Sequence, residues 1–143
     1  VYKRQELMSR SYYCPHCEKL LNPWKKVIFL VENGGEFELV LLSPQLGDYS
    51  AVHSRSMNFV EGAVYTFRCP LCRANLTSSL DNKLVDLVSR LGDDPPVRVS
   101  FSRVHGERAT FLMAEDGVDR FGEDADRYEG VNFFGAAADS NNR

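Results

Sequence analysis

Two apolar runs in the first half of the chain have the pattern of paired β-strands. Residues 27–31 and 37–42 are rich in β-branched and large apolar side chains, and Asn33-Gly34 lies between them. Asn-Gly between two such runs favours a tight hairpin, because these residues accept the positive φ angles of the turn. Ser43-Pro44 predicts the end of the second strand, since proline lacks the amide donor that a sheet requires. Shorter strands are expected within residues 6–13, 49–53 and 63–68.

The second half of the chain predicts another set of strands. Residues 97–104 alternate between apolar and polar positions, as a half-buried strand does. Residues 105–107 predict a turn, residues 109–113 a returning strand, and Asp116-Gly117 a further tight turn. Residues 80–91 fit both a helical stripe and a strand, so both interpretations stay open. We therefore expect a second β-meander, packed on the first or beside it.

All cysteines of the chain lie in two Cys-Pro-x-Cys motifs. A Cys-x-x-Cys loop places two sulfurs on one side of a tight turn, and two facing loops offer four thiolates in the tetrahedral arrangement that zinc prefers. Four thiolates leave no open coordination position, so the metal would be structural. The sequence therefore predicts one structural zinc ion, held by Cys14, Cys17, Cys69 and Cys72.

Other chemistry competes with zinc for these cysteines. Iron fits the same four-thiolate cage. Disulfides need an oxidising compartment, and no export signal is visible. Cys14-Pro-His-Cys17 also matches the active-site tetrapeptide of thioredoxin-like disulfide oxidases, which need the first cysteine at a helix N-terminus. Pro23 would interrupt a helix that began there, so the pattern favours metal binding over redox chemistry.

In its two cysteine motifs the chain resembles the zinc-ribbon and rubredoxin-like families, whose zinc knuckles close the ends of strands. Aromatic, strand-like residues precede each motif, and Leu20 and Leu76 follow them. The chain departs from these families in two ways: Glu18 and Arg73 stand where glycine is common, and 51 residues separate the motifs. The resemblance implies a structural metal and a binding function, with zinc joining the ends of a large insert.

Together these patterns predict a mainly β protein, with a small α+β fold as the alternative, in which antiparallel β-meanders are joined by a zinc-ribbon-like pair of knuckles. Residues 1–7 are expected to be a non-native or disordered leader, and residues 8–79 a zinc-ribbon-like domain with a β insert between its knuckles. Residues 80–134 are expected to form a second β-rich half packed on the first, and residues 135–143 a disordered tail.

The net charge of −3 is distributed unevenly along the chain. Residues 1–26 carry six basic against two acidic residues, whereas residues 106–143 carry nine acidic against four basic ones. Side chains near the first knuckle are candidates for contacts with nucleic acid or another partner, and they are Arg10, Tyr12, Tyr13, Lys19, Trp24, Lys25 and Lys26. A pI of 5.6 argues against a dedicated nucleic-acid-binding protein.

Four aromatic residues in the acidic C-terminal segment allow two interpretations. They either complete the hydrophobic core or form a strip that binds a partner, and they are Phe121, Tyr128, Phe133 and Phe134. The hydrophobic gain from burying aromatic rings favours the core.

The chain contains no phosphate-binding loop, catalytic zinc motif, nucleophile elbow or kinase signature. We interpret His16, His53 and His105 as surface residues, because a general base needs a positioned partner. The longest apolar run, residues 27–31, is too short to cross a membrane.

We therefore expect a non-enzymatic cytoplasmic protein whose structural zinc supports a protein-interaction or adaptor domain. A nucleic-acid-binding zinc-ribbon module and a thiol redox protein are the alternatives.

Overall fold

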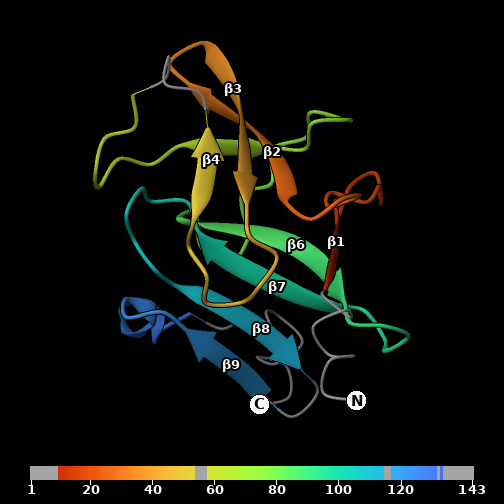
Figure 1. Ribbon diagram of the computed structural model, residues 1–143. Coiled ribbons are helices and arrows are strands. Elements are labelled where there is room, and N and C mark those ends of the chain that lie inside the picture. The colour runs from red at the N-terminus through yellow and green to blue at the C-terminus, as the bar shows by residue number, and fades with distance from the viewer. Residues whose placement is uncertain (1–9, 54–57, 115–116, 132, 134–143) are drawn as a thin grey trace.

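The computed structural model describes residues 10–53, 58–114, 117–131 and 133, which form two antiparallel β-sheets (Figure 1). One sheet has the strand order β1-β6-β7-β8-β9 and the other the order β4-β3-β2-β5. The strands are β1 (Ser11–Tyr13), β2 (Val27–Asn33), β3 (Glu36–Leu42), β4 (Ala51–His53), β5 (Thr66–Arg68), β6 (Leu84–Arg90), β7 (Val97–Ser102), β8 (Thr110–Ala114) and β9 (Gly117–Phe121). The 3₁₀ helix η1 (Ala125–Tyr128) follows β9. The mainly β fold class is confirmed, and the described residues include no α-helix.

The ambiguous segment of residues 80–91 contains strand β6. Its side chains are buried on both faces of the sheet: Val85 and Leu87 pack in the cluster between the two sheets, whereas Leu84 packs in a second cluster on the opposite face. A strand that is covered on both faces has apolar residues at consecutive positions, and this pattern resembles a helical stripe.

The expected hairpin forms between β2 and β3, but its turn lies one residue later than Asn33-Gly34. Asn33 pairs with Glu36, so the two-residue loop consists of Gly34 and Gly35. Their φ angles are 58° and 93°, which glycine adopts without the clash that a Cβ atom causes. The Gly-Gly pair therefore replaces Asn-Gly as the turn that matches the twist of the strands.

The two halves of the chain share one topology and exchange one strand each. In both halves a short strand enters a Cys-x-x-Cys knuckle, and a hairpin follows: β1 precedes the hairpin β2–β3, and β5 precedes the hairpin β6–β7. The lead-in strand β1 pairs with β6, with Tyr13 opposite Val88, and β5 pairs with β2, with Arg68 opposite Leu30. Each lead-in strand thus completes the sheet of the other half. Strand pairing crosses the boundary expected after residue 79, which itself stays a prediction.

The main hydrophobic core lies between the two sheets. Phe29 and Val31 of β2 face Leu87 and Val99 of the five-stranded sheet, and all four side chains are at most 2% exposed. These residues come from alternate positions of their strands, which is why a single face of each sheet supplies them.

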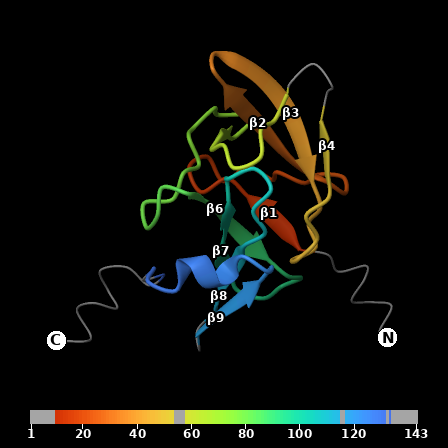
Figure 2. The same ribbon diagram turned by 90° about the vertical axis from the view of Figure 1, so that its left-hand side faces the viewer.

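A second, smaller core covers the opposite face of the five-stranded sheet. Figure 2 shows η1 beside β8 and β9, and its Tyr128 packs on Phe111 with ring centroids 5.5 Å apart. Phe133 lies 4.6 Å from the same ring. Tyr128 and Phe133 are each only 3% exposed, so they are core residues and not a strip open to partners. Phe121 packs at the edge of the main core, and Phe134 lies outside the described residues.

Some expectations concern residues that the structure does not describe. The leader of residues 1–7 and the tail of residues 135–143 fall outside the described ranges, as does Asp116 of the turn before β9. Among the described residues no helix is long and apolar enough to span a membrane.

Candidate metal centre

The first knuckle is a tight loop whose backbone amides point at a cysteine sulfur. The Glu18 amide donates to the Cys14 carbonyl oxygen (2.8 Å), and the Cys14 amide donates to the Lys19 carbonyl oxygen (3.0 Å). The His16 and Cys17 amides donate to the Cys14 sulfur at 3.3 Å and 3.4 Å. Such amide donors favour a thiolate at this position, because they stabilise negative charge on sulfur.

The second knuckle repeats these contacts. The Arg73 amide donates to the Cys69 carbonyl oxygen (2.8 Å), and the Cys69 amide donates to the Ala74 carbonyl oxygen (3.1 Å). The Leu71 and Cys72 amides donate to the Cys69 sulfur at 3.4 Å and 3.5 Å. The two motifs are therefore similar in backbone geometry as well as in sequence.

Glu18 and Arg73 occupy the glycine position of each knuckle. Both have a φ angle of 65°, in the left-handed region that a non-glycine residue enters at a cost of roughly 1–2 kcal/mol. Within the described chain they are the two non-glycine residues with positive φ. The sequence departs from the glycine preference of zinc ribbons at these positions, but the backbone keeps the loop shape that glycine would favour.

The four cysteine sulfurs gather at the junction of the two sheets. All four sulfur atoms lie within 4.8 Å of one another. Sulfurs of opposite knuckles approach to 3.7 Å between Cys14 and Cys72 and to 3.8 Å between Cys17 and Cys69. A tetrahedron with metal–sulfur bonds of about 2.3 Å has sulfur–sulfur edges of about 3.8 Å. The cluster therefore has the size and donor set to hold one metal ion.

These sulfur–sulfur distances show that the cluster is not a pair of disulfide bonds. A disulfide bond is about 2.05 Å long, and all four cysteines are free thiols. No helix begins at Cys14 or Cys69, where strand and turn residues surround both cysteines. The arrangement lacks the helix N-terminus that lowers the pKa of a redox-active cysteine.

The two buried thiols of the cluster need a nearby cation in order to lose their protons. Cys14 and Cys69 are fully buried, and burial raises the pKa of the Cys14 thiol to about 12 and also raises the pKa of Cys69. Cys72 is exposed, and the Ala74 amide beside it contributes most to lowering the pKa of its thiol. A metal ion would stabilise the buried thiolates, so binding would release protons.

The other candidates near the first knuckle do not form one surface. Tyr12 is 4% exposed and its hydroxyl donates to the Pro44 carbonyl oxygen (2.6 Å), so this ring belongs to the core. Arg10 donates to the Ser89 hydroxyl (3.2 Å), and Tyr13 is half-buried. Four candidates remain exposed, namely Lys19, Trp24, Lys25 and Lys26.

Two features of the surface were not expected from the sequence. One is an uncovered apolar face of the four-stranded sheet, and the other is a cleft between the sheets. The first had a visible signal, because Leu39 and Val40 are apolar on successive positions of β3 and so place apolar side chains on both faces of that strand. The cleft had none, because it depends on how the two sheets meet.

No family model matches this chain. Neither the curated proteins nor the solved structures include a significant match. The metal centre is therefore argued from its geometry, and the resemblance to zinc ribbons stays at the level of the knuckles.

Proposed function

We propose that the protein is a non-enzymatic adaptor domain in which structural zinc fixes two sheets, one of which docks a partner protein. Zinc is the ion that best suits four convergent thiolates, since structural zinc sites are closed and tetrahedral. Four protein ligands leave no position for a substrate or an activated water. The metal would therefore support the fold and take no part in chemistry.

The observation that carries the docking proposal is an apolar sheet face open to solvent. We call it the outer face, and it consists of Ile28, Leu30, Phe37, Leu39, Leu41 and Val52. In the strand register Ile28 lies opposite Leu41, which lies opposite Val52. Phe37, Leu39 and Val52 are 48%, 51% and 54% exposed, so no described segment covers them. Contiguous apolar surface of this kind is typical of interaction sites.

The repeated topology indicates what kind of group would cover this face. Val52 pairs with Leu41 of β3 as Phe111 pairs with Ser100 of β7, so the two residues occupy equivalent positions of the two sheets. Phe111 is fully buried beneath aromatic rings of the C-terminal segment, whereas Val52 is more than half exposed. A short partner segment with aromatic or large aliphatic side chains would cover the outer face in the same way.

The acidic residues near the hairpin tip are divided between the two faces of this sheet. Glu36 is exposed beside Phe37, and Glu38 is half-buried on the same strand. Glu32 is already paired with Arg68 at 2.9 Å on the neighbouring strand. Because side chains alternate along a strand, Glu36 and Glu38 point away from the outer face, and the Glu32–Arg68 pair is the charged group that borders its apolar residues.

Site-specific photocrosslinking tests this proposal in the cell. A photoreactive amino acid at Leu39 is expected to give one discrete adduct with another protein, and the same group at Leu71 is expected not to. Leu71 is a matched control because it is 63% exposed but lies in the second knuckle, outside the strands that form the outer face. Adding Val52→Glu should abolish the adduct, because a charge beside position 39 would be buried by the partner.

Three outcomes would overturn the docking proposal. They are the absence of an adduct at position 39, an equal adduct at position 71, and an adduct that contains only a second copy of this chain. The last outcome would indicate self-association through the outer face. Zinc analysis of the purified variants separates loss of docking from loss of the metal-bound fold.

Nucleic-acid binding is the second candidate function, supported by a different surface. Trp24 is 81% exposed in the loop after the first knuckle, and Lys25 and Lys26 follow it directly. An exposed ring beside cations is suited to stacking on a single-stranded base with phosphate contacts. Trp24 is the sole tryptophan of the chain, so quenching of its fluorescence by a single-stranded oligonucleotide reports binding directly. Quenching that does not decrease as salt is added would eliminate this candidate.

A further inference from the structure

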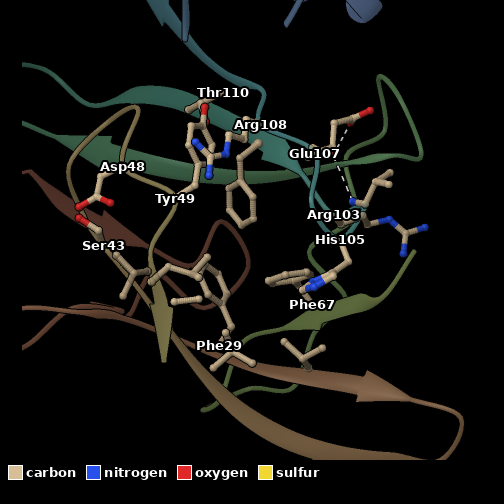
Figure 3. A pocket seen from close by; sticks show the side chains of 18 of the residues that line it. Phe29, Ser43, Asp48, Tyr49, Phe67, Arg103, His105, Glu107, Arg108 and Thr110 are labelled. Atoms are coloured by element: carbon tan, nitrogen blue, oxygen red, sulfur yellow. Dashed lines mark hydrogen bonds between the residues drawn. The ribbon is translucent and has the colours of Figure 1, made fainter. Parts of the chain in front are cut away.

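A cleft of about 350 Å³ opens between the two sheets on the side away from the second core (Figure 3). One wall comes from β2 and β3 and the other from β7 and β8, and two loops, residues 43–49 and 103–109, form its rim. Small-molecule sites in proteins begin at about 300 Å³ and combine apolar walls with a few fixed polar groups. The cleft meets the first condition by its volume.

The interior of the cleft is lined by aromatic rings in edge-to-face contact. Phe29, Phe67 and Phe101 form a triangle with centroid distances of 5.4 Å, 5.6 Å and 5.5 Å. Towards the rim, Phe59 contacts Tyr65 and stacks on His105 at centroid distances of 4.9 Å and 5.4 Å. An apolar chain or ring that entered the cleft would therefore meet ring faces and edges on several sides.

Three charged side chains of the lining are already engaged in the fold. Arg103 donates to the carbonyl oxygens of Asn82 (2.7 Å) and Tyr65 (2.8 Å). Glu107 accepts a hydrogen bond from Tyr128 and pairs with an arginine of η1. Asp48 accepts from the Ser50 amide (3.1 Å). These groups hold the rim together and offer little to a ligand.

Arg108 is the arginine of the rim whose guanidinium is not engaged in hydrogen bonds within the described part of the fold. No ion pair and no hydrogen bond from its guanidinium occurs among the described residues, and its guanidinium carbon lies 5.8 Å from the Tyr49 ring centroid. Figure 3 shows Arg108 beside Tyr49 and Thr110, on the wall across from Phe29. The Tyr49 hydroxyl is fixed by Thr110 Oγ1 (2.8 Å) and by the Phe121 carbonyl oxygen (3.2 Å). The ring is thus a firm support that holds the guanidinium at the mouth of the cleft.

Glu61 is a charged group of the lining that makes no ion pair and no side-chain hydrogen bond among the described residues. Its carboxylate fills the space that a Cβ atom on Gly106 would take, two residues before Arg108 in the chain. Arg108 and Glu61 are therefore the two charged side chains of the lining whose charged atoms form no hydrogen bond or ion pair among the described residues. A ligand with a single negative group is directed to Arg108, and a second negative group would be repelled by Glu61.

We propose that this cleft binds a small carboxylic acid with an apolar body, whose carboxylate pairs with Arg108 and whose body packs on the phenylalanine triangle. The guanidinium fork matches a carboxylate with two parallel hydrogen bonds. The apolar body gains by leaving water for a ring-lined space. This site is separate from the outer face, so it functions independently of partner docking.

Titration of the zinc-loaded full chain with decanoate, followed by backbone amide NMR shifts, tests the site. Saturable shifts are expected in residues 43–49 and 103–109. 1-Decanol has the same chain but no charge, and it is expected to bind about tenfold more weakly, because it cannot form the charge-assisted hydrogen bonds that a carboxylate makes to Arg108. Shifts that map to the outer face, no saturable shift, or equal binding of the alcohol would each overturn the proposal.

Two matched variants separate charge recognition from general apolar binding. Arg108→Gln is expected to weaken decanoate binding about tenfold and to leave 1-decanol binding unchanged. Glu61→Gln makes a similar change elsewhere on the rim and is expected to keep or strengthen decanoate binding. Equal weakening by both variants would show that Arg108 has no specific function in recognition. Melting temperatures of both variants verify that the cleft is intact.

Discussion

Glu18 and Arg73 adopt the same left-handed backbone conformation, with a φ angle of 65° at each, directly after the second cysteine of each knuckle. This strain is the local cost of closing a Cys-x-x-Cys loop without glycine. Glu18→Gly and Arg73→Gly are each expected to raise the free energy of unfolding by about 1 kcal/mol, because glycine enters this region freely. Chemical denaturation of the zinc-loaded protein measures the change. Glu36→Gly, in a strand without positive φ, should instead destabilise the protein.

Metal removal provides the second prediction. The purified protein is expected to contain one zinc ion per chain, and Cys14→Ser or Cys69→Ser should abolish binding and lower the melting temperature sharply, because each serine removes a buried ligand. Metal analysis and thermal melting measure both effects. His16→Ala is the matched control, since this exposed side chain lies within the knuckle but outside the sulfur cluster. Two metal ions per chain, or full zinc content in the serine variants, would contradict the single four-thiolate site.

The two faces of the four-stranded sheet should respond differently to truncation. Phe29→Ala is expected to destabilise the protein by about 3–5 kcal/mol, because this ring is 1% exposed between the sheets and its loss leaves a cavity. Phe37→Ala should cost less than about 1 kcal/mol, since its ring is 48% exposed on the outer face. Equilibrium unfolding in urea measures both. A comparable cost at Phe37 would mean that the outer face is covered in solution.

A buried phenol gives a prediction for alkaline pH. Burial raises the pKa of Tyr12 from its ordinary value of 10.0 to about 12, so the folded state binds this proton more tightly than the unfolded state. The stabilisation that the folded state gains by keeping Tyr12 protonated is fully present below pH 10 and is lost as the pH rises towards 12. Tyr12→Phe removes this contribution. The difference in unfolding free energy between the wild type and Tyr12→Phe should therefore shrink between pH 9 and pH 12. A constant difference across this range would show that the phenol does not titrate differently on folding.

The sequence predicts the local features of this protein better than its long-range pairing. The cysteine motifs, the first hairpin and the strand of residues 97–104 are local patterns, and all three appear close to the expected positions. The pairing of β1 with β6 joins Tyr13 to Val88, and no local pattern encodes a contact over such a separation. The convergence of the four sulfurs could be predicted from the sequence, because it follows from metal coordination and does not depend on strand propensity.

Burial on the sheet faces was the harder part to predict. Tyr12 and Tyr128 were candidates for partner contacts because aromatic rings suit both cores and interfaces. Their hydroxyls find hydrogen-bond partners inside the protein, at Pro44 and Glu107, and only the structure shows this. The successive apolar positions of β3 contained the signal that both of its faces are apolar, but which face is covered depends on where the other sheet packs.

The exchange of the two lead-in strands sets the order in which this protein can mature during synthesis. β1 leaves the ribosome before β6 and finds its neighbour only after residues 84–90 of β6 have emerged. The first pair of thiols likewise waits for Cys69 and Cys72 before a metal can be fully enclosed. Neither half can complete its sheet in advance, so folding of the nascent chain and full enclosure of the ion both wait until residues 69–90 have left the ribosome.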